Sequence, residues 1–164
     1  MRLFTALWPP PDAVAELAAA LRPDDVPAGW RAMDSATWHL TLAFHGDAEP
    51  GVLARALEGG GRGLPAPRLR IAGTGAFDGV RWAGVEADPP ADLHTLVTVA
   101  GGDLTRFVPH VTLLRRRARS GPDPAVELPV PAGSWWRPDE ILLVSSEPGR
   151  RGPRYRVVHR VPLA

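Results

Sequence analysis

The sequence contains the tetrapeptide His39-Leu40-Thr41-Leu42 and repeats its form, His-x-Thr-Leu, at His110-Val111-Thr112-Leu113, 71 residues further along the chain. Each copy lies in a segment typical of a β-strand, residues 37–44 and residues 107–114. Side chains on a strand alternate between its faces, so the His and the Thr of each copy share one face. We expect apolar packing on the opposite face, which in the first copy would hold Trp38, Leu40, Leu42 and Phe44.

The rest of the chain supplies further strands and short helices around these two segments. Periodicity predicts strands at 2–8, 68–76, 80–87, 140–146 and 155–163, and helices at 14–21, 49–58 and 92–99. Gly46 is expected to end the first motif strand, and the glycines at 59–61 to end a helix and begin a flexible link. Loops are expected around Pro27 to Asp34 and, rich in proline, over 121–131. Strands that outnumber helices without regular alternation indicate an α+β fold, and 164 residues suffice for one domain or two small lobes sharing a cleft.

The composition excludes several kinds of chemistry. The chain has no cysteine, which removes disulfides, thiolate nucleophiles and cysteine-ligated metals. All 19 basic residues are arginine, so a P-loop lysine, a Schiff base and a lysine–nucleotide adduct are also excluded. Compositional bias explains the absence of lysine, but the chemical exclusion holds whatever its origin.

Charge is distributed unevenly along the chain. Residues 1–110 carry 9 Arg against 13 acidic residues, whereas residues 111–164 carry 10 Arg against 5. The basic part includes the run from Arg115 to Arg119 and the pair Arg150-Arg151. Such clusters are often a solvated surface, but they also permit an anionic ligand such as a nucleic acid.

Nothing in the sequence predicts a membrane protein. No apolar run approaches the roughly 20 residues needed to cross a bilayer. The first ten residues have a short apolar stretch followed by proline and acid, without a small-residue cleavage site, so we expect no signal peptide. We therefore expect a cytoplasmic protein without membrane partners.

The spacing within each motif suits phosphate chemistry. Residues at i and i+2 on one face of a strand lie roughly 6.5–7 Å apart, which lets an imidazole and a hydroxyl hold one phosphate between them. Opening a phosphodiester needs a base for water and an acid for the leaving oxygen, and imidazole serves either role near neutrality. Hydroxyls can donate to the non-bridging oxygens as charge develops. A single His-x-Thr-Leu would more often be a structural accident, but two copies in apolar-backed strands favour function.

Metal binding is the main rival for paired histidines. Neither motif has a second histidine or a carboxylate at ligand spacing. His45 is expected on the same face as His39, but about 20 Å away along an extended strand. We therefore expect no metal, and we assign no role to His45, His94 or His159.

The two motifs and their flanking segments resemble the two-histidine (2H) phosphoesterase superfamily, and within it the bacterial RNA 2′,3′-cyclic phosphodiesterases, also called 2′-5′ RNA ligases or the LigT-like family. The resemblance runs almost from end to end of the chain. It rests on the opening 2–4, the extended first motif 40–44 with Gly46, the segments 75–77 and 82–85, the second motif within 107–115, and the closing 154–155 and 162–163.

The resemblance implies that residues 1–164 form one domain of two intertwined, pseudo-symmetric lobes, each with an antiparallel sheet and outer helices, around a central cleft. It implies hydrolysis of 2′,3′-cyclic phosphate ends of RNA, or of nucleotides, to 2′-phosphates without a metal or a cofactor, with 2′-5′ ligation as a reverse reaction. His39 would protonate the leaving 3′ oxygen and His110 would activate water, in an assignment that the pseudo-symmetry makes reversible. Thr41 and Thr112 would bind the phosphate and Arg115 would stabilise charge. We expect a monomer.

Arg115 matches the family's arginine at the end of the second motif, but strict alternation places it on the face opposite His110, so its role requires the strand to twist or end near Leu114. Two features set this chain apart from the family pattern. The family often has a second Phe where this chain has Thr5, which alters one expected aromatic wall of the cleft. The stretch from Asp92 to Phe107 is short, which predicts a clipped helix. Two alternatives therefore stay open: a nucleotide or RNA sensor with little turnover, and a phosphodiesterase acting on another small cyclic nucleotide.

Overall fold

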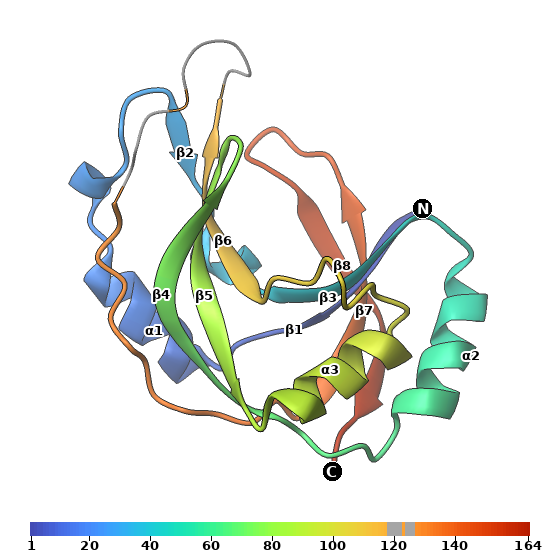
Figure 1. The fold of residues 1–164 in the computed structure, drawn as a ribbon. Coiled ribbons are helices and arrows are strands. Elements are labelled where there is room, and N and C mark those ends of the chain that lie inside the picture. Colours follow the sequence, from blue (N-terminus) through green and yellow to red (C-terminus); the bar gives the residue numbers. More distant parts are fainter. Residues whose placement is uncertain (118–122, 124–126) are drawn as a thin grey trace.

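A computed structural model of the chain describes residues 1–117, 123 and 127–164. Arg119 and five of the eleven residues of the proline-rich loop expected at 121–131 (residues 121, 122 and 124–126) lie outside these residues. Within the described part, the strands form two four-stranded antiparallel sheets (Figure 1). The first has the order β3-β1-β7-β8, with β1 (Arg2–Leu7), β3 (Leu40–Asp47), β7 (Glu140–Glu147) and β8 (Arg154–Pro162). The second has the order β2-β6-β5-β4, with β2 (Trp30–Ala32), β4 (Arg68–Phe77), β5 (Val80–Asp88) and β6 (His110–Arg116).

Each α-helix of the described residues begins at a proline: α1 (Pro11–Ala20), α2 (Pro50–Gly61) and α3 (Pro90–Val99). Proline suits the first helical position because its fixed φ is already helical and its missing N–H would have no intrahelical partner. Helix α1 packs against β4, α2 against β7 and β8, and α3 against α2, β3 and β5. Helices therefore accompany both sheets, as expected for an α+β fold of two lobes (Figure 1).

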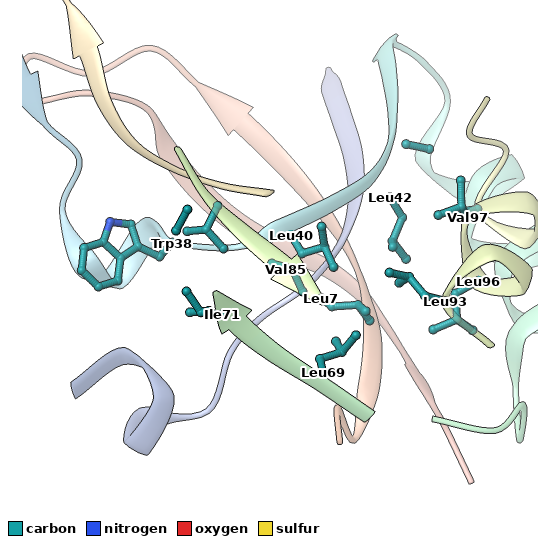
Figure 2. Close-up of a cluster of buried hydrophobic side chains, with 14 of the residues drawn as sticks. Leu7, Trp38, Leu40, Leu42, Leu69, Ile71, Val85, Leu93, Leu96 and Val97 are labelled. Carbon is teal, nitrogen blue, oxygen red and sulfur yellow. The ribbon is translucent and has the colours of Figure 1, made fainter. Parts of the chain in front are cut away.

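The two sheets share one apolar core. Leu7 on β1 and Leu40 and Leu42 on β3 belong to the same buried cluster as Leu69, Ile71 and Val85 of the other sheet. Figure 2 shows these side chains, with Leu93, Leu96 and Val97 of α3 beside Leu42. The strands that carry the two motifs are therefore backed by a common layer of packed side chains, which sets their relative position.

The structure corrects three local expectations. Strand β2 lies in the region expected to be a loop, where it pairs with β6. Gly46 does not end β3: the strand continues to Asp47, and Gly46 pairs with Leu3 although its φ is positive, at 63°. The glycines expected to form a flexible link are the last turn of α2, where a Cβ on Gly61 would lie 3.3 Å from Ile141 Cδ1. The missing side chain lets α2 approach the sheet closely.

The remaining differences are at element ends. Strand β6 begins at His110 rather than at 107, and β3 begins at Leu40, after a short 3₁₀ helix at Ser35–Thr37. Helix α3 covers the predicted 92–99 and extends two residues further toward its N-terminus. No helix in the described part of the chain is long and apolar enough to cross a membrane.

Candidate active site

The five residues singled out from the sequence line one cleft. Its volume is about 630 Å³, and both sheets contribute to its walls. Strand β3 and the residues before it supply His39 and Thr41, and β6 supplies His110, Thr112 and Arg115. Further residues line the same cleft, among them Arg2, Phe4, Arg31, Thr37, Phe44, Phe77, Ser146 and Tyr155. The two motifs are thus 71 residues apart in the sequence but open onto one space.

The two histidines are held in the same way. Nδ1 of His39 lies 2.6 Å from the carbonyl oxygen of Thr37, and Nδ1 of His110 lies 2.6 Å from that of Val108. A carbonyl oxygen can only accept, so in each ring Nδ1 carries the proton and donates it. Nε2 of the neutral ring is then an acceptor with its lone pair free, and gains a proton only when the ring is charged. Both rings are therefore fixed in the tautomer that leaves Nε2 for substrate.

The threonine of each motif keeps its hydroxyl available. Thr41 and Thr112 are half-buried, line the cleft, and have no hydrogen-bond partner among the described residues. Each lies two residues after its histidine in an extended segment, which puts imidazole and hydroxyl on one face. An anion between the motifs could therefore receive a hydroxyl hydrogen bond from either side.

A β-bulge in β3 reverses the alternation just after Thr41. Ala6 pairs with Thr41 and Thr5 with Ala43, so Leu42 is an extra residue on β3. Leu42 and Ala43 are consequently both buried. Alternation then resumes with the opposite phase, and Phe44 lines the cleft with 79% of its surface exposed. The expectation that Phe44 packs in the apolar layer was wrong, because it assumed an unbroken strand.

The second motif has the same bulge. Trp82 pairs with Thr112 and Arg81 with Leu114, so Leu113 is the extra residue of β6. Leu113 and Leu114 are both buried, and Arg115 lies on the cleft side with His110. The carbonyl oxygen of Leu113 accepts a hydrogen bond of 2.8 Å from the N–H of Met33, which satisfies it at the irregularity. The bulge is the physical reason that Arg115 reaches the cleft when strict alternation would point it away.

The electrostatics of the cleft favour neutral imidazoles in the free protein. The pKa of His39 is lowered to about 4, mainly by burial and to a smaller extent by the nearby positive charges of His110 and Arg115. Burial likewise lowers the pKa of His110, again helped by Arg115. The hydrogen bonds to Thr37 and Val108 oppose these effects, because they stabilise the charged rings. An anion bound between the rings would relieve the repulsion and raise both pKa values.

Aromatic side chains surround both rings, and most of them were not singled out from the sequence. His39 stacks against Phe4 at 4.9 Å and Trp8 at 4.7 Å between ring centroids, and meets the edge of Tyr155 at 5.4 Å. Alternation along a strand at 2–8 places Phe4 and Trp8 on one face, but nothing in the sequence links that face to His39.

His110 has a matching pair of aromatic neighbours. Phe77 lies 5.1 Å and Trp82 5.6 Å from it between ring centroids. The indole of Trp82 lies across Gly75, where a Cβ would come within 2.1 Å of the ring. Gly75 therefore makes room for the aromatic ring that packs beside His110.

Thr5 does not form a wall of the cleft. Its side chain is buried at 1% exposure on the face of β1 opposite Phe4, and its Oγ1 lies 2.8 Å from Nε2 of His45. The bulge in β3 also places His45 on this opposite face, so the expectation that it shares a face with His39 was wrong. The replacement of a family Phe by Thr5 thus affects the interior of the lobe, and the aromatic wall beside His39 is intact.

The other two histidines lie away from the motifs. His94 is exposed on α3, and Nε2 of His159 lies 2.9 Å from Oε1 of Glu58, in a contact that links β8 to α2. Over residues 1–117, 123 and 127–164, no group of three or more His, Asp or Glu side chains is arranged to hold a metal ion.

Comparison with known proteins places this architecture in a family. The model of the LigT-like phosphoesterases matches residues 7–85, which include the first motif. The chain is 34% identical to an RNA 2′,3′-cyclic phosphodiesterase of Thermus thermophilus over 184 aligned positions, covering 99% of this chain and 90% of that protein.

Solved structures agree with this relationship. The apo structure of E. coli LigT has a TM-score of 0.77 and 28% identity, covering 99% of this chain and 97% of that one. The structure of E. coli LigT with 3′-AMP has a TM-score of 0.75 and 29% identity over the same shares of the two chains. The chain therefore belongs to the LigT-like family of RNA 2′,3′-cyclic phosphodiesterases, within the two-histidine phosphoesterase superfamily.

Proposed function

We propose that this protein hydrolyses 2′,3′-cyclic phosphate ends of RNA to 2′-phosphate ends, using His39 and His110 as an acid–base pair without a metal. The observation that carries the proposal is the matched orientation of the two rings: each Nδ1 donates to a backbone carbonyl two residues earlier, which leaves each Nε2 for the cleft. The 34% identity to an RNA 2′,3′-cyclic phosphodiesterase supports the substrate class.

The reaction needs one neutral and one charged imidazole. Nε2 of the neutral ring takes a proton from water as the water oxygen attacks phosphorus. The bond from phosphorus to the 3′ oxygen breaks, and that oxygen takes the proton from Nε2 of the charged ring. The product carries a 2′-phosphate and a 3′-hydroxyl, and the two rings have exchanged protonation states. Bond changes and protons balance without any further reactant.

The family resemblance gives His39 the acid role and His110 the base role. The buried surroundings of His39 disfavour its charged form, with a pKa of about 4 in the free protein. The acid role therefore requires the substrate phosphate to stabilise the imidazolium by direct contact. The hydroxyls of Thr41 and Thr112 would donate to the non-bridging oxygens, and Arg115 would offset the charge that develops on them.

The same arrangement can join RNA ends. A 5′-hydroxyl in place of water would attack the cyclic phosphate and displace the 3′ oxygen, which forms a 2′-5′ linkage. This route uses no nucleotide cofactor and no lysine adduct, in agreement with a chain whose 19 basic residues are all arginine. We propose ligation as a secondary activity of the same cleft.

The sensor alternative loses its motivation. It rested on an altered aromatic wall at Thr5, and Thr5 faces away from the cleft. A phosphodiesterase that acts on another small cyclic nucleotide would be distinguished by comparing its products on RNA ends with those on mononucleotides. A cytoplasmic location and a monomeric state remain predictions from the sequence.

The test uses protein treated with EDTA and a short RNA that ends in a 2′,3′-cyclic phosphate. We expect conversion to a 2′-phosphate, identified by ³¹P NMR and mass spectrometry. A 3′-phosphate product would contradict the proposed bond cleavage. Activity that EDTA removed and a divalent metal restored would contradict the metal-free mechanism, and tight binding without turnover would restore the sensor alternative.

A further inference from the structure

A second cavity beside the cleft is walled by arginine. It has a volume of about 400 Å³, and every described residue that lines it is an arginine: Arg31, Arg115, Arg116, Arg117, Arg150 and Arg151. Arg31 and Arg115 also line the catalytic cleft, so the two cavities are neighbours that share part of a wall. Positive charge thus continues outward from the site where the cyclic phosphate would bind.

Three separate segments bring these arginines together. Arg31 lies on β2 and pairs with Arg115 of β6 across the sheet. Arg117 follows β6 directly, and its N–H donates to the carbonyl of Gly29 at 2.8 Å. Arg150 and Arg151 come from the other sheet, in the connection between β7 and β8. The cavity is therefore built by both sheets, as the cleft is.

The turn that carries Arg150 and Arg151 is well defined. The N–H of Gly152 donates to the carbonyl of Gly149 at 3.2 Å, which closes the turn around the two arginines. The Arg31 guanidinium lies beside it, since a Cβ on Gly152 would be 3.8 Å from Nη2 of Arg31. This hydrogen bond and the contact with Arg31 therefore place the turn, and the arginines that it carries, beside β2.

The charges of this cavity are poorly neutralised within the protein. Arg116 pairs with Asp78 at 3.0 Å and lies 4.0 Å from Asp123, but its buried Nε and Nη1 make no hydrogen bond to another described residue. None of the other five arginines has a carboxylate partner among the described residues. Like charges held this close repel one another, so an anion from outside would stabilise the arrangement.

We propose that this cavity binds the internucleotide phosphates of the RNA strand whose cyclic phosphate end occupies the cleft. The inference rests on the proposed function and adds a requirement for the chain upstream of the reacting end. Guanidinium groups suit phosphate oxygens because they offer planar pairs of donors and stay charged. Six arginines far exceed the charge of a single terminal phosphate, and match a backbone that presents several phosphates in succession. The enzyme is therefore selective for oligonucleotides over cyclic mononucleotides.

The test compares the wild type with a triple variant that combines Arg117→Gln, Arg150→Gln and Arg151→Gln. These three arginines line the second cavity and not the cleft. Three substrates are needed: a 2′,3′-cyclic mononucleotide, the same compound with a 5′-phosphate, and a hexaribonucleotide ending in 2′,3′-cyclic phosphate. The control variant carries Arg22→Gln, Arg55→Gln and Arg106→Gln, which remove the same charge from exposed positions outside both cavities.

We expect the triple variant to lower kcat/KM for the hexanucleotide by about 10-fold or more at low salt, mainly through a higher KM. Its kcat/KM for the mononucleotide without a 5′-phosphate should stay within about 2-fold of the wild-type value. The slope of log KM against log salt for the hexanucleotide should fall by about 2, which is roughly 0.7 for each of three lost phosphate contacts to a single strand. The control variant should retain the wild-type preference and salt slope. Unchanged thermal unfolding would show that the variants fold.

Three results would overturn the assignment to internucleotide phosphates. An equal loss for the 5′-phosphorylated mononucleotide would show that the cavity takes a terminal phosphate. An equal loss for all three substrates would show that the arginines act on the cyclic phosphate that the substrates share, and a loss for none would show that the cavity binds no substrate phosphate. Wild-type hydrolysis of the mononucleotide tests the proposed function separately. If that hydrolysis fails, anisotropy of a labelled hexanucleotide with a 2′-phosphate end still tests the arginine cavity.

Discussion

Phe44 and Arg115 occupy equivalent positions, each five residues after the histidine of its motif and each brought to the cleft by a bulge of one residue. Without the bulges, both side chains would lie on the apolar side of their strands. Each motif is thus a unit of six residues that presents His, Thr and a third side chain to the same space. The third side chain differs, and it gives the two halves of a pseudo-symmetric site different chemistry.

Arg115, the third side chain of the second motif, should stabilise the charge of the reacting phosphate. We expect Arg115→Gln to lower kcat by about 10²–10³-fold, the range found when one donor to a developing oxyanion is removed. Arg115→Lys should recover only part of this loss, because an ammonium lacks the planar pair of donors. Steady-state kinetics on a 2′,3′-cyclic mononucleotide measures both. A normal kcat in Arg115→Gln would show that Arg115 does not contact the phosphate.

Phe44, the third side chain of the first motif, should bind the nucleobase of the substrate. Phe44 is 79% exposed at the cleft, so Phe44→Ala should leave the thermal unfolding temperature nearly unchanged. Stacking of a base on an aromatic ring is worth about 1–3 kcal/mol, so we expect KM to rise about 10-fold or more with kcat retained. Phe44→Tyr keeps the ring and serves as the control. A large loss of stability in Phe44→Ala would contradict the exposed position.

The pH dependence of kcat/KM follows from the lowered pKa values of both rings. The free protein is competent when one ring is charged and the other neutral. Protonation of both rings removes the base as the pH falls toward about 4, and deprotonation of both removes the acid as the pH rises. We therefore expect the maximum of kcat/KM between about 4 and the ordinary histidine pKa of about 6.5.

NMR titration of the imidazole protons provides the direct check on this profile. The His39 signal should titrate near 4 in the free protein and at higher pH when inorganic phosphate is present. A midpoint at 6.5 or above without an anion would contradict the buried surroundings described for this ring.

Thr5 should matter for stability and not for chemistry. Its hydroxyl is buried and hydrogen-bonded to Nε2 of His45 at 2.8 Å. Thr5→Val keeps the shape but removes this bond, which should lower the free energy of unfolding by about 1–3 kcal/mol. Urea denaturation measures the loss, and Thr5→Ser is the matched control because it keeps the hydroxyl. Loss of activity in a folded Thr5→Val variant would contradict its place behind the cleft.

Period-two alternation was enough to predict the α+β class, seven of the strands and the pairing of each histidine with its threonine. It failed where the backbone departs from a regular strand. No characteristic residue type marks these bulges in the sequence. Leu42-Ala43 and Leu113-Leu114 look like ordinary pairs of apolar residues. Consecutive apolar residues after His-x-Thr were the available signal, because strict alternation would have required a polar residue at one of the two positions.

Other features depend on contacts between distant segments. The stacking of Phe4 and Trp8 on His39 joins two strands whose pairing the sequence does not specify. Strand β2 has three residues and is formed by backbone pairing with β6, which lies far from it in the sequence. The arginine cavity likewise joins β2, the end of β6 and the turn at Arg150-Arg151. The charge count identified an excess of arginine in residues 111–164, but it did not indicate where these side chains come together in the fold.

The central claim is that two imidazoles act on one phosphate, and the most direct test is the rate of hydrolysis of a 2′,3′-cyclic phosphate by His39→Ala, His110→Ala and the double variant. We expect each single variant to lose about 10²–10⁴ in kcat, and the double variant to lose much less than the product of the two, because acid and base act in one step. Nearly normal rates in either single variant, with the protein folded, would contradict the claim.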